Sequence, residues 1–167
     1  MKNPRSKSRE LALQALFYMD MRHEVSAKLL DMYCENFIFS QEEEDQILFF
    51  GEKASEFSTE LVVPFFTKLV RGLIPVISEI DTIIERFSSN WKISRMGCVD
   101  RNAIRIAVYE FMFCEDIPPK VSINEAINIG KKFGTPESGA FVNGILDSIR
   151  IALKEKKIHM LPSQKKT

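Results

Sequence analysis

Apolar side chains recur along this chain at the three- and four-residue intervals that are typical of amphipathic helices. The longest such pattern, between residues 62 and 88, comprises Phe66, Leu69, Leu73, Ile77, Ile80, Ile84 and Phe87. Gly72 and Pro75 interrupt it, and a proline inside a helix removes a backbone donor and clashes with the preceding turn. We therefore expect either one kinked helix or two abutting helices over these residues.

Capping residues predict where other helices begin. Asn3 stands before Pro4, and this pair fits a helix start because a first-turn N–H has no helical partner in any case. The buried face of that helix is expected to comprise Ala12, Ala15, Leu16 and Met19. Ser26 is expected to cap a second helix, and Asp100 is expected to begin a later one.

Two capping boxes, in which serine precedes glutamate by three residues, predict further starts: Ser40 with Glu43, and Ser122 with Glu125. Pro118 and Pro119 are expected to break the helix that begins near Asp100. Gly134 is expected to end the next helix, because glycine accepts the left-handed conformation that often follows a last turn. The pair Thr135–Pro136 then predicts the start of a final helix.

No alternating strand pattern of useful length and no internal repeat stands out in the 167 residues. Seven glycines and seven prolines are too few for an all-β chain rich in tight turns. A composition of 45% hydrophobic and 28% charged residues is that of a soluble globular protein. The predicted fold class is therefore all-α, with six to eight helices in one compact bundle.

Charge cancels overall but is unevenly placed. Lysine plus arginine and aspartate plus glutamate each total 23, which excludes a protein that wraps nucleic acid by bulk attraction. The first nine residues contain four cations and no acid: Lys2, Arg5, Lys7 and Arg9. Arg5 and Arg9 are four residues apart and share a helix face. This basic N-terminus is either a solvated arm or one side of a phosphate-binding groove.

Cysteine usage and apolar run lengths bear on the compartment. The three cysteines are widely spaced and form no CxxC pair, so neither a disulfide framework nor a zinc site is expected. The apolar stretch Leu11–Met19 superficially imitates a signal peptide, but Gln14 interrupts it and no small-residue cleavage site follows. Runs without a charge are far shorter than a bilayer span. We expect a soluble protein of the cytoplasm, with no membrane partner.

The common catalytic motifs are missing, which argues against an enzyme. The fragment Gly130–Thr135 superficially resembles a phosphate loop, but it falls at a predicted helix C-terminus, where the dipole favours cations. We expect no catalytic residue, no metal site and no cofactor. Helical spacing favours a core position for Phe133, whereas for Phe141 it leaves open whether the ring is core or a base-stacking platform.

Several segments, in matching order, resemble the NusB family of transcription antitermination factors. They are the basic opening and helix at residues 5–17, VDRNAIRIAVYE at 99–110, IPPKVSINEAI at 117–127, KFG at 132–134 and FVNGILD at 141–147. The resemblance implies about seven helices in two packed helical subdomains. Residues 1–153 would form a single RNA-binding domain, and 154–167 a basic, frayed C-terminal tail.

The resemblance also implies a non-catalytic function. Family members bind the single-stranded boxA element of nascent ribosomal RNA leaders together with NusE, a small-subunit ribosomal protein, and join an antitermination complex with RNA polymerase. The residues that would face RNA are Lys2, Arg5, Lys7, Arg9, Lys131, Lys132, Glu137, Ser138 and Phe141. Phe17 and Asp100 match the surface that faces NusE, and Asp100 would either cap its helix alone or also bind this partner.

Departures from the family pattern bear on affinity. Ser6 and Ser8 interrupt a basic opening that is denser in many members, and Gly139-Ala140 replaces a stretch that often carries a basic residue. Fewer phosphate contacts predict a weak lone binder that depends on NusE. The acidic segment 40–60 matches the family least.

Two other classes of function stay open at this point. A similar helical module is fused to a methyltransferase in some RNA cytosine methylases, but this chain has no room for a cofactor-binding α/β domain. Alternatively, the chain is a protein-interaction scaffold or a self-associating homodimer that binds no RNA.

Overall fold

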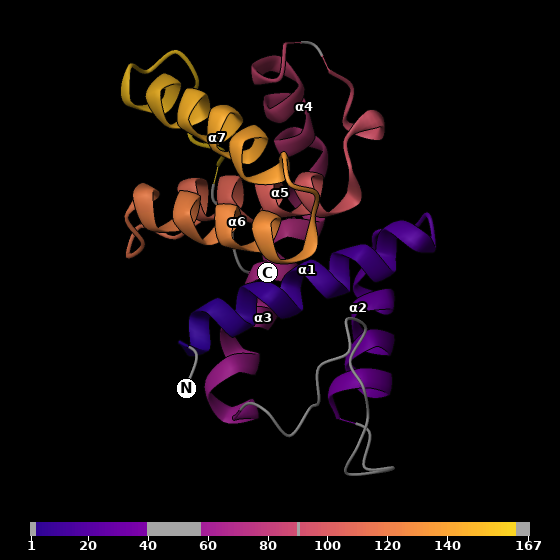
Figure 1. The fold of residues 1–167 in the computed structure, drawn as a ribbon. Coiled ribbons are helices and arrows are strands. Elements are labelled where there is room, and N and C mark those ends of the chain that lie inside the picture. The colour runs from indigo at the N-terminus through magenta and orange to yellow at the C-terminus, as the bar shows by residue number, and fades with distance from the viewer. Residues whose placement is uncertain (1–2, 40–57, 90, 163–167) are drawn as a thin grey trace. The chain divides into compact units, whose positions relative to one another are not determined.

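A computed structural model describes residues 3–39, 58–89 and 91–162 (Figure 1). Within these ranges the chain forms seven α-helices and no strand. The helices are α1 (Pro4–Met21), α2 (Ala27–Tyr33), α3 (Thr59–Leu73), α4 (Ile77–Phe87), α5 (Cys98–Phe113), α6 (Pro119–Phe133) and α7 (Ser138–Lys154). Short helical turns cover η1 (Cys34–Ile38), η3 (Ile74–Val76) and η4 (Ile93–Arg95). The all-α prediction and the expected number of helices are confirmed.

The chain divides into two compact units, Met1–Pro75 and Val76–Thr167. Two helical subdomains are what the family resemblance implied. The expected division into a domain at residues 1–153 and a tail at 154–167 stays a prediction.

In the first unit α1 packs mainly against α3 (Figure 1). Ser8 Oγ ties the two helices together by donating to the Val62 carbonyl oxygen at 2.7 Å. The predicted face of α1 is buried, but so is every other residue from Lys7 to Leu16. The predicted face is therefore confirmed, but burial extends around the whole middle of the helix, which one apolar stripe does not predict.

The apolar pattern between residues 62 and 88 forms two abutting helices. α3 ends at Leu73, the 3-10 turn η3 contains Pro75, and α4 begins at Ile77. Both helices direct their apolar stripes into protein: Phe66 and Leu69 are fully buried in α3, as is Ile80 in α4. The sequence was compatible with either one kinked helix or two helices, and the structure has two helices.

By length and composition alone, the helical stretch Thr59–Phe87 could cross a membrane. It is interrupted at Pro75, and Lys68 and Arg71 lie along its first half. Core helices of soluble proteins pass the same test. Length and hydropathy here therefore give no membrane assignment.

In the second unit α5 contacts α4, α6 and α7. The buried apolar side chains of this unit include Ile80, Ile84, Ile104, Val108, Ile123, Ile129, Val142, Ile145, Leu146 and Ile149. α6 and α7 pack closely on each other and are joined by only four residues. They form a helical hairpin.

Two predicted helix starts in this unit were wrong. α5 begins at Cys98 with Gly97 as its N-cap, so Asp100 lies inside the first turn rather than at the cap. α6 begins at Pro119 with Pro118 as its N-cap, one turn before the predicted capping box. Proline is tolerated at the first helical position, so this pair starts a helix as well as ending one. Ser122 instead donates a hydrogen bond from its hydroxyl to Glu110 Oε2 at 3.3 Å.

The end of α6 and the start of α7 follow the prediction in part. Gly134 ends α6, but its φ of −95° is not left-handed. α7 begins at Ser138, after the predicted Thr135–Pro136 start. Thr135 still bonds to the first residue of α7, because its N–H donates to Ser138 Oγ at 2.9 Å. The proposed box at Ser40 and Glu43 lies outside the described residues.

Candidate nucleic-acid interface

The start of α1 places the N-terminal cations. Asn3 caps the helix as predicted, since its side-chain oxygen accepts from the Arg5 N–H at 2.9 Å. Arg5 is exposed, and its guanidinium lies 4.9 Å from the centre of the Phe65 ring. The Arg9 guanidinium lies 5.4 Å from the same ring. The prediction that Arg5 and Arg9 share a helix face is confirmed.

The other N-terminal cations differ in exposure. Arg9 and Lys7 are only 3% and 5% exposed, and the Lys7 ammonium lies 3.6 Å from Glu10 Oε2. Lys2 lies outside the described residues. Among the described cations of this opening Arg5 is the most exposed, and RNA contact by all four residues stays a prediction.

The α6–α7 hairpin carries the second group of predicted RNA residues. Lys131, Lys132 and Glu137 are exposed, Phe141 is half-buried, and Ser138 is buried. All five lie between the last turn of α6 and the first turn of α7. The Ser138 hydroxyl lies inside the hairpin, where it accepts from Thr135.

Phe133 is not a core residue, so the prediction that favoured the core was wrong. Its ring is half-buried, and the Lys132 ammonium lies 4.7 Å from the ring centre. An ammonium over an aromatic face is attracted by the ring quadrupole. The end of α6 thus presents an aromatic surface with a cation on it.

Small residues let the two helices of the hairpin approach each other. A Cβ at Gly139 would lie 3.3 Å from Cγ and Cε of Lys131, and one at Gly130 would lie 3.3 Å from the Ser138 Cβ. Gly139 is one of the departures from the family pattern. Its effect here is to let the Lys131 side chain run across the first turn of α7.

Trp91 is the residue that the sequence analysis missed. Its indole is 51% exposed and meets the Phe141 ring edge-on, with ring centres 5.8 Å apart and planes at 73°. This is a favourable aromatic geometry. The available signal was the single tryptophan of the chain directly before Lys92. Pairing with Phe141 requires a tertiary contact that helical periodicity does not predict.

The segment that carries Trp91 is tied back to α4. Ser88 Oγ donates to the Trp91 carbonyl oxygen at 3.0 Å, and the Ile93 N–H donates to Glu85 Oε1 at 2.8 Å. The Lys92 ammonium lies 3.6 Å from Glu85 Oε2. These contacts hold an exposed indole in a defined position, as a stacking surface requires.

The two residues predicted to face NusE are partly accessible. Phe17, in α1, and Asp100, in the first turn of α5, are both half-buried. Asp100 Oδ1 is shielded from solvent and has no hydrogen-bond partner among the described residues. A carboxylate in a first helical turn is favoured by the helix dipole.

Perturbed titratable groups lie in the core rather than in a cleft. Burial raises the pKa of the Cys34 thiol to about 11, and burial also raises the pKa of Tyr33 and of Tyr109. These three groups provide no acid–base pair at a surface. Among the described residues no group of three or more His, Cys, Asp or Glu side chains is placed to hold a metal ion.

Comparison with known proteins decides the family. The model of the NusB family matches residues 6–150. The chain belongs to the NusB family. Transcription antitermination protein NusB of Desulfatibacillum aliphaticivorans is 48% identical over 154 residues, covering 92% of this chain and 94% of that protein. The NusB protein of Myxococcus xanthus is 40% identical and covers 90% of this chain and 97% of its own length.

Solved structures of NusB proteins have the same fold. NusB from T. maritima matches with a TM-score of 0.70 and 34% identity, covering 94% of this chain and 99% of that one. A crystal structure of the antitermination factors NusB and NusE in complex with dsRNA matches with a TM-score of 0.69 and 28% identity, covering 91% of this chain and 99% of that one. The all-helical fold of this chain is thus the NusB fold.

Proposed function

We propose that this chain is a transcription antitermination factor that binds the boxA element of nascent ribosomal RNA leaders together with NusE and helps RNA polymerase read through terminators. The observation that carries the proposal is the family match over residues 6–150. Relatives at 40–48% identity are named transcription antitermination proteins. A related solved structure contains NusB, NusE and RNA.

In the second unit, single-stranded RNA would bind at the turn between α6 and α7. Unpaired bases stack on aromatic faces, and the exposed Trp91 with the half-buried Phe141 offers an aromatic pair there. Lys131 and Lys132 are exposed at the end of α6 and would contact phosphates. Glu137 would accept hydrogen bonds from base edges. Ser138 would act indirectly, by holding the turn closed.

In the first unit, Arg5 would be the principal described phosphate contact. Its guanidinium rests against Phe65, which limits its freedom before RNA arrives. Lys2 would extend this contact toward the N-terminus. Lys7 and Arg9, being buried, would contribute mainly positive potential beneath the surface.

NusE would bind through Phe17 and Asp100. Asp100, which is half-buried, would offer its carboxylate to a basic group of NusE. Phe17 would add apolar contact area. Two modest binding events on RNA and on NusE would reinforce each other, because the first raises the effective concentration for the second.

The proposed role is non-enzymatic and cytoplasmic. Binding, rather than bond-making, fits a chain whose strongly perturbed groups are core phenols and a core thiol. RNA polymerase and its antitermination complex would be the eventual partner of the assembled NusB–NusE–boxA unit.

The test is fluorescence anisotropy of a labelled single-stranded boxA RNA, titrated with this protein with and without NusE at two salt concentrations. A scrambled strand and a boxA duplex serve as comparison ligands. We expect NusE to tighten binding to boxA, and Lys131→Glu with Lys132→Glu to weaken it by about tenfold or more and to reduce the salt slope by about two. Arg5→Glu should also weaken binding.

The matched control is Lys28→Glu with Lys68→Glu, which makes the same charge change at exposed positions of α2 and α3. It should leave boxA affinity nearly unchanged. Equal binding of scrambled RNA, or no binding by folded monomer with or without NusE, would contradict the proposal and favour the scaffold alternative. A homodimer that binds no RNA would favour self-association. Equal boxA affinity with and without NusE would overturn only the dependence on NusE.

A further inference from the structure

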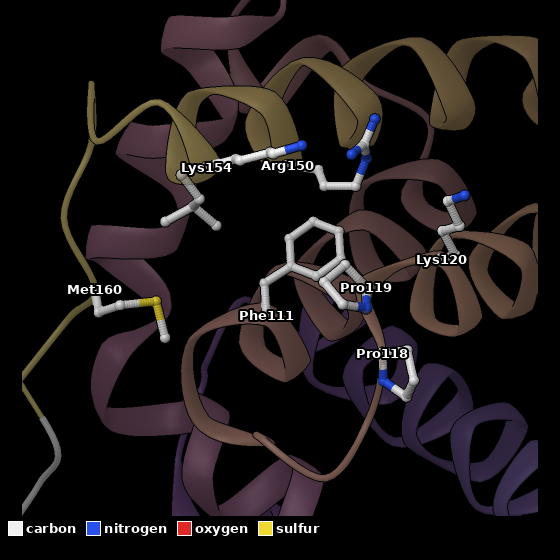
Figure 2. Close-up of a pocket in the computed structure, with 8 residues that line it drawn as sticks. Phe111, Pro118, Pro119, Lys120, Arg150, Lys154 and Met160 are labelled. Carbon is white, nitrogen blue, oxygen red and sulfur yellow. The ribbon is translucent and has the colours of Figure 1, made fainter.

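An apolar groove lies in the second unit, away from the predicted RNA residues of that unit (Figure 2). It encloses about 530 Å³, and its floor and walls are formed by Phe111, Pro118, Pro119, Leu153 and Met160. Figure 2 shows Phe111 and Pro119 among the side chains that surround it. The groove therefore exposes apolar surface from the end of α5, the start of α6 and the end of α7.

The rim of the groove is basic. Lys120, Arg150 and Lys154 line it, and no acidic residue does within the described part of the chain. Arg150 is paired with Asp147 at 2.7 Å, whereas Lys120 and Lys154 are exposed and have no ion-pair partner among the described residues. An apolar floor between unpaired ammonium groups is complementary to an apolar segment that carries carboxylates.

The segment after α7 forms one wall of this groove. Lys156 adopts a left-handed φ of 58°, and the Lys157 N–H donates to the Ala152 carbonyl oxygen at 2.9 Å, so the chain reverses after the helix. Ile158 is then buried, and Met160 is placed on the groove while remaining 49% exposed. A flexible methionine at an open wall can adapt to different apolar side chains.

The groove and the predicted RNA residues lie at opposite ends of the α6–α7 hairpin. Lys120 lies in the first turn of α6 and Lys131 in its last turn, which at about 1.5 Å per residue places them roughly 16 Å apart. Phe141 and Leu153 are separated by a similar distance along α7. A ligand in the groove would thus leave the RNA-facing turn free.

We propose that this groove binds a protein partner through an acidic amphipathic segment, whose bulky apolar side chains enter between Phe111, Leu153 and Met160 while its carboxylates pair with Lys120 and Lys154. The groove offers cations but few other hydrogen-bonding groups, so recognition rests on charge and apolar shape. This partner site shares no residue with the proposed RNA and NusE contacts and does not depend on them.

The test uses the full chain and three synthetic peptides of equal length. One carries leucine and phenylalanine flanked by aspartate and glutamate, the second replaces its acids with lysine, and the third replaces its apolar residues with serine. Binding is followed by NMR chemical shifts of Phe111, Leu153 and Met160. We expect the acidic apolar peptide alone to shift these resonances in a saturable manner.

Reversing the charge of the groove's rim is the decisive experiment. Lys120→Glu with Lys154→Glu changes only exposed side chains and should weaken binding of the acidic peptide at least about tenfold, while allowing the lysine peptide to bind. The control, Lys28→Glu with Lys68→Glu, should bind the acidic peptide as the unmodified protein does. Circular dichroism and thermal melting establish that both variants are folded.

Several results would overturn the proposal. They are the absence of any shift at the groove, equal shifts with the lysine or serine peptide, and retention of acidic-peptide binding after charge reversal. Shifts of the same resonances on adding boxA RNA alone would assign the groove to nucleic acid. A dimer in sedimentation that charge reversal dissociates would assign it to a second copy of this chain.

Discussion

Arg105 of α5 donates hydrogen bonds to both carboxylate oxygens of Asp81 of α4, with Nε–Oδ1 and Nη2–Oδ2 distances of 2.7 Å each. The Arg105 side chain is 8% exposed and that of Asp81 is 20% exposed, so solvent screens this pair only weakly. A third donor of the same guanidinium, Nη1, bonds to Asn102 Oδ1 at 2.9 Å. This bidentate pair therefore fixes the register of α4 against α5 and also neutralises the charge of Arg105.

Removing Asp81 should destabilise the protein strongly. Asp81→Ala leaves a largely buried guanidinium without its carboxylate, which should lower the free energy of unfolding by about 2–4 kcal/mol. The control is Asp31→Ala, which breaks the exposed Arg71–Asp31 pair and should cost less than about 1 kcal/mol. Urea denaturation measures both. Similar losses of unfolding free energy in the two variants would show that the buried Asp81 pair stabilises the protein no more than an exposed pair does.

Alanine substitutions at two glycines should have opposite effects. A Cβ at Gly134 would lie 2.7 Å from the Gly130 carbonyl oxygen, which is backbone and cannot move aside cheaply, so Gly134→Ala should cost about 1–3 kcal/mol. A Cβ at Gly144 meets nothing within 4 Å, so Gly144→Ala in α7 should stabilise by about 0.5–1 kcal/mol through helix propensity. Thermal melting of both variants would check this, and destabilisation by Gly144→Ala would contradict it.

The Cys34 thiol should be unreactive in the folded protein. Burial raises its pKa to about 11, so at pH 8 its thiolate fraction should be about 100-fold below that of a free cysteine. Alkylation followed by peptide mass spectrometry should label Cys34 slowly, and rapidly once guanidinium unfolds the chain. Rapid labelling in the native state would show that α2 opens readily.

The raised pKa of Cys34 also makes the stability of the protein depend on pH, with a definite sign. Between about pH 9 and pH 11 the unfolded thiol ionises while the folded thiol stays protonated, so the free energy of unfolding falls as pH rises. Below the unfolded pKa the contribution is complete and constant. Cys34→Ala should show a shallower decline over this interval in denaturant titrations. An unchanged slope would indicate that other groups cause the decline.

Intrinsic fluorescence should report RNA binding, because Trp91 is the single tryptophan of the chain. Stacking of a base on its half-exposed indole should quench the emission on addition of boxA RNA. Trp91→Ala should weaken binding by about 1–3 kcal/mol without changing the salt slope, because no phosphate contact is lost. Trp91→Phe should retain much of the affinity. Unchanged emission at saturating RNA would remove Trp91 from the site.

Helical periodicity and caps predicted most of the fold, because α3, α4 and α7 each bury one stripe. They failed where polar residues are buried. Gln14 is fully buried in α1 and accepts a hydrogen bond from the Tyr33 hydroxyl at 3.3 Å, a contact set by tertiary packing. The predicted start of α6 was wrong for another reason, because Pro119, expected to break a helix, also begins one.

The candidate site could be predicted only from the family resemblance. Spacing alone did not distinguish Arg5, which is exposed, from Arg9, which is buried one turn later. Nor did it pair Trp91 with Phe141, which are 50 residues apart. Such properties depend on which neighbours cover a side chain, and this is fixed by the assembled fold.

The burial of α1 has a consequence for synthesis. Leu11, Leu13 and Leu16 leave the ribosome before α3, yet within this unit α1 packs mainly against α3, whose last residue follows Met21 by about 50 positions. At roughly 5–20 residues per second, these leucines remain uncovered for several seconds. α1 must therefore wait for α3, and during that interval its apolar side chains are exposed to chaperones and to premature aggregation.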